Sequence, residues 1–279
     1  MEKVKKVLIL GSSGMLGHTL LSTIKSNELF SVYNISRKKM IDKNTIICDV
    51  LDFNQLEKNI KKISPDYIIN CIGVLIKESN HDPKNAFFLN SYLPNFLESI
   101  SGRYKFELIH ISTDCVFSGN QGGYHEDSVK DAKDVYGISK GLGEVNSPNH
   151  LTIRTSIIGP ELKSKPEGLF EWVLNNRGKT IDGFTKSMWS GVSTLFLSRA
   201  IIFCIQNNIK GLLHISNDKI SKYDLISIIN DIYDLRINVN KVEGKISDKS
   251  LISNRNDFQL SVPAYYEMIL EMYELTNQN

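Results

Sequence analysis

The sequence has little of what marks secreted, membrane-spanning or nucleic-acid-binding proteins. Four of its 279 residues are cysteines, and none has the CxxC spacing of a zinc or redox site. No apolar run reaches the ~18 to 20 residues of a membrane span, and the N-terminal run, Val7 to Leu10, is too short for a signal peptide. The 33 basic and 31 acidic side chains nearly cancel, which gives no support for nucleic acid or an anionic membrane as a partner. We therefore expect a reduced, cytoplasmic protein without a metal site.

What the sequence does contain predicts an α/β protein. Its composition, 41% apolar and 23% charged, is that of an ordinary globular protein. Strand-like and helix-like segments alternate through the first half, which is typical of a doubly wound parallel sheet. We expect strands at 4–10, 32–36, 45–49, 67–73, 106–111, 151–158 and 212–215. We expect helices from the turn at 11–17 to about 26, from an N-cap at Asp52 to 63, and at 83–100, 168–177, 194–207, 221–235 and 264–275.

The second half is less regular and predicts a smaller lobe. Gly159-Pro160 favours a boundary, because proline lacks a backbone donor and has a fixed φ. The apolar segment 212–215 is expected to return to the main sheet. We expect one cofactor domain, residues 1–159 with a return segment at about 190–216, and a lobe formed by residues 160–189 and 217–279.

A glycine-rich turn, GxxGxxG, follows the first expected strand. Gly11, Gly14 and Gly17 let the backbone turn tightly, bring amides against a pyrophosphate and let the next helix pack on the strand. Taken alone, the motif is equally compatible with a turn that binds nothing. Its place at the first strand of an alternating pattern favours a dinucleotide site, in which we include Gly11, Ser13, Gly14, Met15, Leu16 and Gly17.

One stretch in the middle of the chain carries the functional prediction. A buried strand, 106–111, delivers Ser112-Thr113-Asp114 to its carboxyl end, where open α/β sheets bind their ligands. Tyr136 and Lys140 follow, and in a helix they lie one turn apart on the same face. Alone, such a pair is a common surface feature. Its order after the glycine turn and the Ser-Thr strand makes it specific.

These residues resemble the hallmark of the short-chain dehydrogenase/reductase superfamily, YxxxK with a Ser or Thr from the preceding strand. The segments STDCVFSG (112–119) and YGISKGLGE (136–144) are similar to its extended branch, and most of all to dTDP-4-dehydrorhamnose reductases. The resemblance covers nearly the whole chain. It implies an NAD(P)H-dependent oxidoreductase with a Rossmann-type cofactor domain and a smaller C-terminal substrate-binding lobe.

Reduction of a ketone gives its oxygen alkoxide character and requires a proton donor within hydrogen-bond reach. Tyr136 is the expected donor, although the pKa of a free tyrosine is ~10. A neighbouring cation favours the phenolate, so we expect Lys140 to lower the pKa of Tyr136. The resemblance implies that Lys140 also binds the nicotinamide ribose. It further implies that Thr113, or in its place Ser112, donates a hydrogen bond to the carbonyl oxygen.

The end of the second expected strand predicts the cofactor. An NAD site places Asp or Glu there, whereas this chain has Ser36-Arg37, and a guanidinium pairs well with a 2′-phosphate. We therefore expect NADPH, with NADH as a second possibility. The alternative is an exposed basic turn that binds nothing. The resemblance adds positions along the cofactor at Asp49, Val50, Cys71, Ile72 and Gly73, and a supporting one at Asn90.

The residues after Thr113 separate related activities. Sugar-nucleotide 4,6-dehydratases carry Thr-Asp-Glu where this chain has Thr113-Asp114-Cys115, and a thiol is a poor substitute for that acid. The rhamnose reductases usually have tyrosine at Cys115 and tryptophan at Ile157, so this chain departs from their sugar-facing residues. The segment 186–193 resembles a nucleotide-sugar loop, in which Trp189 either stacks on a base or packs in the core. The expected substrate contacts are Asp114, Cys115, Arg154, Lys186 and Trp189.

Together these residues predict NADPH-dependent reduction of the 4-keto group of a nucleotide-diphosphate 4-keto-6-deoxyhexose. The expected substrate is dTDP-4-dehydrorhamnose or a UDP-linked 2-acetamido analogue, for synthesis of cell-surface polysaccharide sugars. Two alternatives stay open. One is a nucleotide-sugar epimerase of the same fold. The other is a non-catalytic NADP-binding subunit, because the regulatory subunit of methionine adenosyltransferase also resembles these reductases. The sequence does not decide between a monomer and a homodimer.

Overall fold

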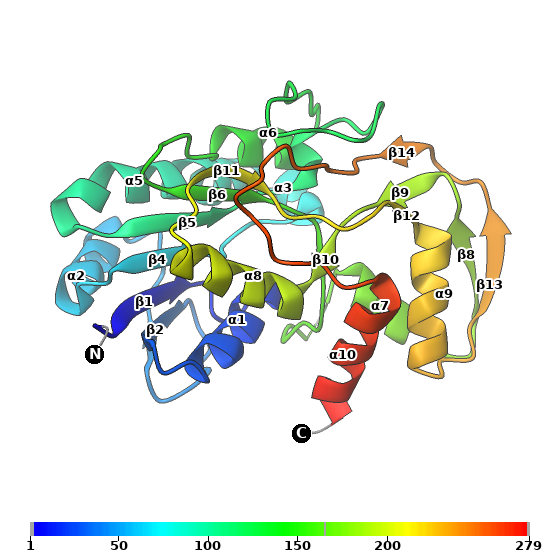
Figure 1. Cartoon of the computed structure of the whole chain (residues 1–279), viewed down its shortest axis with the longest axis horizontal. Helices are drawn as coiled ribbons and strands as arrows, with labels where there is room; N and C mark the ends of the chain where they lie inside the picture. The colour runs from blue at the N-terminus through cyan, green and yellow to red at the C-terminus, as the bar shows by residue number, and fades with distance from the viewer. Residues whose placement is uncertain (1–2, 165, 278–279) are drawn as a thin grey trace.

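A seven-stranded sheet forms the centre of the computed structural model, which describes residues 3–164 and 166–277 (Figure 1). The strands lie in the order β11-β6-β5-β4-β1-β2-β3, and every neighbouring pair is parallel. The order reverses between β1 and β4, which opens a crevice at the carboxyl ends of the strands. The doubly wound parallel sheet and its late return strand are therefore confirmed. The strands are β1 (Lys5–Leu10), β2 (Phe30–Ser36), β3 (Thr45–Ile47), β4 (Tyr67–Asn70), β5 (Glu107–Ile111), β6 (Leu151–Arg154) and β11 (Gly211–His214).

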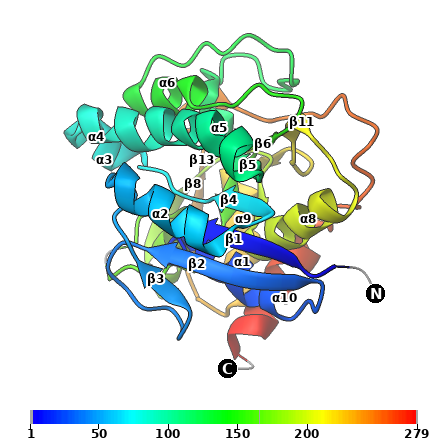
Figure 2. The ribbon, with the colours of Figure 1, turned by 90° about the vertical axis from the view of Figure 1, so that its left-hand side faces the viewer.

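Helices cover both faces of this sheet (Figure 2). The alternation of side chains along β1 shows why: Val7 and Ile9 belong to one core cluster, and Leu8 and Leu10 belong to the other. All four side chains are fully buried. The first cluster packs against α1 (Met15–Lys25) and α8 (Thr194–Gln206), and the second against α2 (Phe53–Ile63) and α5 (Leu93–Tyr104).

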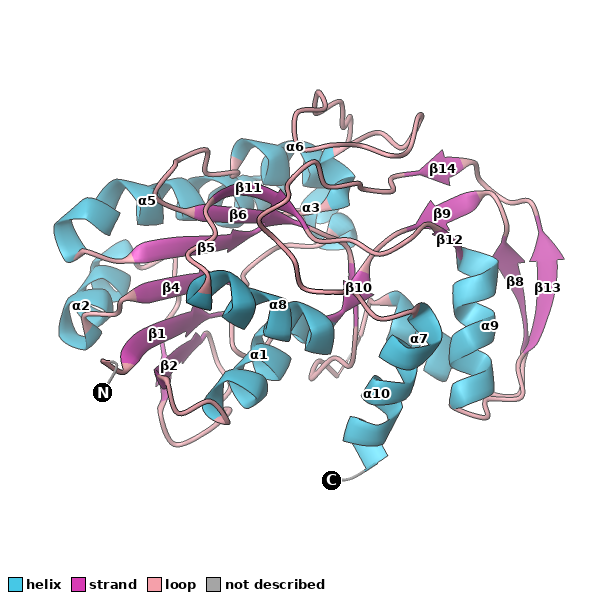
Figure 3. Cartoon of the chain, viewed as in Figure 1, coloured by secondary structure: helices cyan, strands magenta, loops and turns pink. Residues whose placement is uncertain are grey.

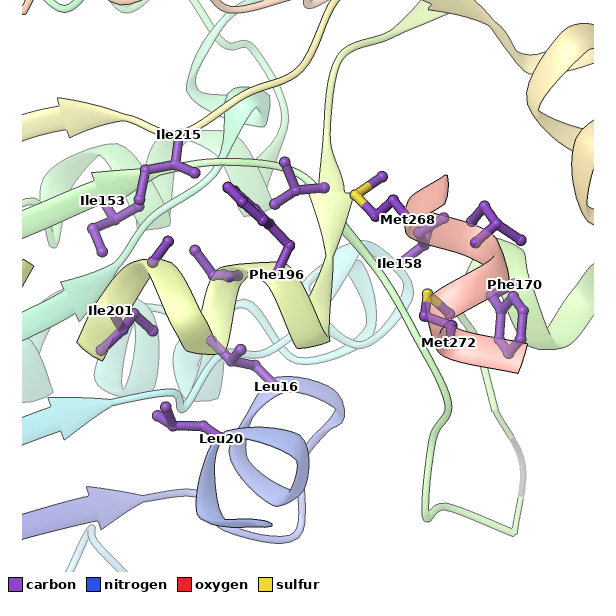
Figure 4. Packing of buried hydrophobic residues seen from close by; sticks show 14 of the residues in the cluster. Leu16, Leu20, Ile153, Ile158, Phe170, Phe196, Ile201, Ile215, Met268 and Met272 are labelled. Atoms are coloured by element: carbon purple, nitrogen blue, oxygen red, sulfur yellow. The ribbon is translucent and has the colours of Figure 1, made fainter. Parts of the chain in front are cut away.

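The C-terminal part adds short strands and further helices beside the main sheet (Figure 3). The first core cluster continues into this part, where Met268 and Met272 join Leu16 and Phe196 (Figure 4). The sequence predicted the helices and, as the end of the strand expected over 151–158, β7. It predicted none of the other strands, because segments of two to five residues are too short to show a period. The elements are β7 (Ile157–Ile158), α7 (Leu169–Leu174), β8 (Thr180–Phe184), β9 (Ser187–Trp189), β10 (Val192–Ser193), β12 (Ile220–Ser221), α9 (Lys222–Ile232), β13 (Asn238–Val242), β14 (Ser247–Asp248) and α10 (Tyr265–Asn277).

Two expected elements are interrupted near the crevice. The helix expected over 83–100 is α4 (Pro83–Phe87), followed by a π-helical turn (Phe88–Tyr92) and then α5. The strand expected over 151–158 ends at Arg154 and resumes as β7. Turns of this π type frequently occur at functional sites. Helix α3 (Ile76–His81) was not predicted, and helix α6 (Val135–Leu142) carries Tyr136 and Lys140.

Candidate functional site

Two adjoining cavities form a cleft at the carboxyl ends of the strands. The first cavity has a volume of about 610 Å³ and the second about 450 Å³. The turn after β1, the segment after β4 and the segment before α7 line both of them. Because their walls share residues, the two cavities form one continuous cleft. The shared residues are Gly14, Cys71, Ile72, Gly73, Leu75, Lys163 and Glu167.

The glycine turn lies where the two cavities meet. Gly11 has φ +84°, a left-handed conformation that favours glycine. A Cβ at Gly17 would lie 2.1 Å from the carbonyl oxygen of Gly11, so a glycine is needed for α1 to pack this closely on the turn. Gly17 itself lies behind the turn. The other predicted residues line the cleft: Gly11, Ser13 and Gly14 the second cavity, and Gly14, Met15 and Leu16 the first.

Arg37, Asp49 and Val50, predicted at the adenosine end of a dinucleotide, line the second cavity. Ser36 does not. Its side chain is buried, its hydroxyl donates to Ser13 Oγ at 3.2 Å, and it accepts the backbone N–H of Lys39 at 3.3 Å. Ser36 therefore supports the glycine turn, and its direct contact with the cofactor stays a prediction.

Thr113, Tyr136 and Lys140 line the first cavity together. Helix α6 reaches this position because of Gly137, where a Cβ would lie only 2.2 Å from the carbonyl oxygen of Cys115. This close approach places Tyr136 in the same cavity wall as Thr113, whose hydroxyl donates to Asp114 Oδ1 at 3.0 Å. The sequence did not single out Gly137, although it is the second residue of the YxxxK motif.

Burial dominates the ionisation of Tyr136 and Lys140. It raises the pKa of Tyr136, against the effect of the hydrogen bond from Thr113. It lowers the pKa of Lys140 to about 8. Lys140 Nζ donates to the carbonyl oxygen of Ile111 at 2.6 Å. Burial thus opposes the lowering of the Tyr136 pKa that we expect from Lys140, whose own hydrogen bond goes to Ile111, and that expectation stays a prediction.

Among the predicted substrate contacts, Asp114 and Cys115 line the first cavity, whereas Arg154 lines neither. Arg154 forms a bidentate ion pair with Glu144, with Nε to Oε1 at 2.7 Å and Nη2 to Oε2 at 2.9 Å. Its guanidinium carbon lies 5.1 Å from the centroid of the Phe117 ring. These contacts use the guanidinium inside the protein and give Arg154 a structural role, and its contact with substrate stays a prediction.

Trp189 and Lys186 also lie outside both cavity walls. Lys186 is exposed. Trp189 is buried, with its ring 5.6 Å from that of Tyr265, and its Nε1 donates to Ser156 Oγ at 2.8 Å. Ser156 lines the first cavity. Of the two alternatives for Trp189, core packing holds, and the residue supports the cavity wall from behind.

Asn90, predicted as a supporting residue, joins two parts of the cleft without lining it. Its Oδ1 accepts the N–H of Val74 at 2.8 Å, and its Nδ2 donates to the carbonyl oxygen of Val74 at 3.1 Å. The same Nδ2 donates to Ser139 Oγ of α6 at 3.0 Å. Asn90 therefore ties the segment after β4 to the helix that carries Tyr136, which fits the supporting role predicted for it, and a direct contact with the cofactor stays a prediction.

The sequence missed several residues of the first cavity. Thr155 and Ser156 follow β6 at the same edge of the sheet as Thr113, so the rule that identified Thr113 could have found them. No motif marks the segment before α7, where Glu161 Oε1 accepts the N–H of Glu167 at 3.0 Å. The remaining unpredicted residues of this wall are Leu75, Ile76, Lys77, Ile111, Lys163 and Gly168.

No helix within residues 3–164 and 166–277 is long and apolar enough to cross a membrane. The same residues contain no cluster of three or more His, Cys, Asp or Glu side chains that could hold a metal ion.

Comparisons with known proteins agree with the resemblance seen in the motifs. Residues 5–249 match the family model described as the RmlD substrate binding domain. Methionine adenosyltransferase 2 subunit beta of Xenopus tropicalis is 26% identical over 255 residues, which cover 83% of this chain and 73% of that protein.

Two solved structures show the same architecture. A hypothetical dTDP-4-dehydrorhamnose reductase from Sulfolobus tokodaii is 29% identical, with a TM-score of 0.81 over 92% of this chain and 95% of that one. A dTDP-4-dehydrorhamnose reductase from Bacillus anthracis, in complex with NADP, is 21% identical, with a TM-score of 0.84 over 98% and 100% of the two chains. At 21% identity, the similarity to the Bacillus anthracis structure shows only that the two proteins share a fold.

Proposed function

Because the chain belongs to the RmlD substrate-binding domain family, we propose that it is an extended short-chain reductase that acts on a nucleotide-linked keto sugar. The proposed reductant is NADPH, and the proposed acceptor is the 4-keto group of a nucleotide-diphosphate 4-keto-6-deoxyhexose used for cell-surface polysaccharides. One observation carries this proposal. Thr113, Tyr136 and Lys140 line a cavity that continues into the cleft beside the glycine turn.

The second cavity has features that fit a dinucleotide. The left-handed Gly11 and the close packing at Gly17 place the N-terminus of α1 at the cleft, where a helix attracts a pyrophosphate. Arg37 on the same wall is suited to a 2′-phosphate, with which a guanidinium makes charge-assisted hydrogen bonds. When bound, NADPH supplies the hydride.

The protein binds the keto sugar, orients its carbonyl and delivers a proton. The phenol of Tyr136, whose pKa burial raises, is protonated at neutral pH, which is the state that a proton donor needs. Thr113, in the same cavity wall, provides a second polar group for the carbonyl oxygen. Lys140, with a pKa of about 8, is largely protonated at neutral pH and stabilises the phenolate left after proton transfer.

The sugar end of the first cavity favours reduction over dehydration. Burial raises the pKa of the Cys115 thiol to about 12. A thiol that stays protonated and weakly acidic cannot replace the carboxyl group that dehydratases use at this position. Cys115, Ser156 and Ile157, which line the cavity near Thr113, are the proposed sugar-facing residues.

We further propose that residues 1–159 and about 190–216 bind the dinucleotide, and that residues 160–189 and 217–279 bind the nucleotide sugar. Lys163 and Glu167, from the second set, line both cavities, which supports a lobe that contacts both ligands. The cytoplasmic location and the possibility of a homodimer remain predictions.

A second candidate function has an observation of its own in its favour. Relatives that match 83% of the chain are the beta subunits of methionine adenosyltransferase 2. On this hypothesis the protein binds NADP and a partner protein without turning over a sugar.

Turnover with deuterated cofactor separates these functions. The protein is incubated with NADPH deuterated at C4 and a panel of dTDP- and UDP-linked 4-keto sugars. A reductase consumes one NADPH per product and places deuterium at C4 of the sugar. An epimerase forms product without stoichiometric NADPH loss. Tight NADPH binding without turnover of any sugar in the panel favours the non-catalytic subunit.

A further inference from the structure

A buried ion pair joins the three segments that build the first cavity. Glu144 lies two residues after the end of α6, and Arg154 is the last residue of β6. Their side chains are 6% and 3% exposed, and the guanidinium donates a hydrogen bond to each carboxylate oxygen. Ser112, at the end of β5, donates its hydroxyl hydrogen bond to Oε1 of the same carboxylate at 2.8 Å. Helix α6 and strands β5 and β6 therefore meet at Glu144.

Lys140 and Glu144 form hydrogen bonds with two consecutive residues at the end of β5. Lys140 Nζ donates to the carbonyl oxygen of Ile111 at 2.6 Å, and Glu144 accepts the hydroxyl of Ser112. The next residue is Thr113. These two contacts, four residues apart along the chain, fix the position of α6 relative to the hydroxyl that faces the cavity.

We propose that Glu144 is a positioning residue that, through Ser112 and Lys140, holds α6 against the end of β5. Thr113 and Tyr136 can then both reach the same carbonyl oxygen of the substrate. This inference rests on the proposed reductase function. Glu144 lines neither cavity, so it acts through its neighbours and does not touch a ligand.

The carboxylate also controls the charge of Lys140. Burial lowers the pKa of Lys140, and the negative charge of Glu144 is the largest effect that opposes this shift. The other titratable groups that interact with Lys140 are the Cys71 thiol, whose pKa burial raises to about 12, and His110, whose pKa burial lowers. Together with the phenol of Tyr136, these groups are neutral at neutral pH. Glu144 therefore supplies the negative charge that keeps the ammonium protonated.

Glu144 itself stays ionised in this buried position. Burial raises its pKa, but the hydrogen bond and charge of Arg154 and the charge of Lys130 outweigh burial and lower it overall. Lys130 Nζ lies 3.0 Å from Oε2. On the far side, His214 contacts Arg154 at 3.3 Å, and burial lowers the pKa of this imidazole, so it adds no positive charge at neutral pH.

Glu144→Gln tests the inference because it keeps the shape of the side chain and removes the charge. The pKa of Lys140 then falls further below about 8, since less opposes the effect of burial. Because kcat/KM requires the ammonium, its fall at high pH should move to lower pH by about 0.5 to 1 unit. We expect kcat to fall about tenfold, with the NADPH dissociation constant changed less than about threefold.

Two variants serve as controls. Glu144→Asp keeps the charge on a shorter side chain. The pH at which its kcat/KM falls should therefore stay within about 0.3 unit of the wild-type value, although kcat falls. Glu57→Gln removes an ion-paired glutamate on α2, 2.9 Å from Arg103 and outside both cavities. This variant should leave unchanged both kcat and the pH at which kcat/KM falls. Thermal unfolding of each variant checks that it is folded.

The proposal is overturned if a folded Glu144→Gln protein loses kcat/KM at the same high pH as wild type, whatever its kcat. A purely structural role would lower kcat without moving this pH. Should Glu144→Gln fail to fold, Arg154→Lys replaces it: this variant keeps the charge and loses the bidentate pair, so kcat should fall about tenfold. Unchanged kcat in Arg154→Lys then overturns the proposal. Tyr136→Phe is measured alongside. If it is fully active, the reductase function itself fails; if it is inactive while Glu144→Gln behaves as wild type, only this inference fails.

Discussion

A Cβ placed on Gly137 would lie 2.2 Å from the carbonyl oxygen of Cys115 and 2.5 Å from the Cβ of Ala132. Helix α6 thus touches the segment after β5 through a residue that has no side chain. This contact sets how near the phenol of Tyr136 comes to Thr113. The glycine inside the YxxxK motif is therefore a geometric requirement of the proposed proton donor.

Gly137→Ala should separate α6 from the segment after β5. The added methyl group meets backbone, which cannot give way as a flexible side chain does. Since a displacement of about 1 Å can cost about 10²-fold in rate, we expect kcat to fall by at least about that factor. The control is Gly102→Ala in α5, where an added Cβ has no atom within 4 Å. Wild-type turnover in Gly137→Ala would show that this contact does not position Tyr136.

Trp189→Phe should weaken binding of the sugar nucleotide and spare the cofactor. The variant keeps an aromatic ring in the core but loses the donor to Ser156 Oγ, which belongs to the wall of the first cavity. A neutral hydrogen bond contributes about 0.5 to 1.5 kcal/mol, so KM for the sugar nucleotide should rise about 2- to 12-fold. Trp172→Phe, at a residue 44% exposed on α7, is the matched control. Equal KM values in the two variants would contradict the role given to Trp189.

Arg37→Asp should weaken NADPH and leave NADH nearly unaffected, because a carboxylate repels the 2′-phosphate that a guanidinium attracts. A charged hydrogen bond is worth about 1.5 to 3 kcal/mol, or roughly 10- to 150-fold in affinity. Lys38→Asp changes the net charge equally at a residue that does not line the cavity, and is the control. The measurement is kcat/KM for both cofactors. A ratio of NADPH to NADH that does not move would mean that Arg37 points away from the ribose.

The stability of the protein should depend on pH through Lys140. Its pKa is about 8 in the folded protein and 10.5 in an ordinary setting, so the unfolded chain binds more protons between these values. Wild type should therefore gain stability relative to Lys140→Met as pH rises through this window, by at most about 3 kcal/mol. Urea unfolding of both proteins at several pH values between about 8 and 10 measures this difference. Parallel stability profiles would show that the pKa of Lys140 is not lowered by folding.

The sequence predicted the elements whose determinants are local. Asp52 accepts the N–H of Gln55 at 3.0 Å, so the expected N-cap is confirmed, and Ser221, where a second helix was expected to begin, likewise accepts the N–H of Asp224 at 3.0 Å. Leu56 and Ile60, spaced for one face of a helix, are fully buried. Caps and periods of this kind involve residues within about four positions of each other, which a sequence displays directly.

Contacts between distant segments were not predictable in the same way. Arg154 carries a charge that suits a phosphate, and only the packing of β6 against the end of α6 gives it Glu144 as its partner. The hydrogen bond from Trp189 to Ser156 likewise joins the C-terminal part to the main sheet. Lys163 belongs to no motif, and its place beside both cavities follows from tertiary structure alone.

In the proposed reaction, Tyr136 delivers the proton to a sugar carbonyl inside the first cavity. Tyr136→Phe removes one hydroxyl group and keeps the ring that packs at this position. The decisive measurement is kcat of this variant with a 4-keto sugar nucleotide, beside its NADPH dissociation constant. We expect kcat to fall by about 10² to 10⁴-fold with NADPH binding nearly unchanged. A Tyr136→Phe protein that turns over at the wild-type rate would contradict the claim.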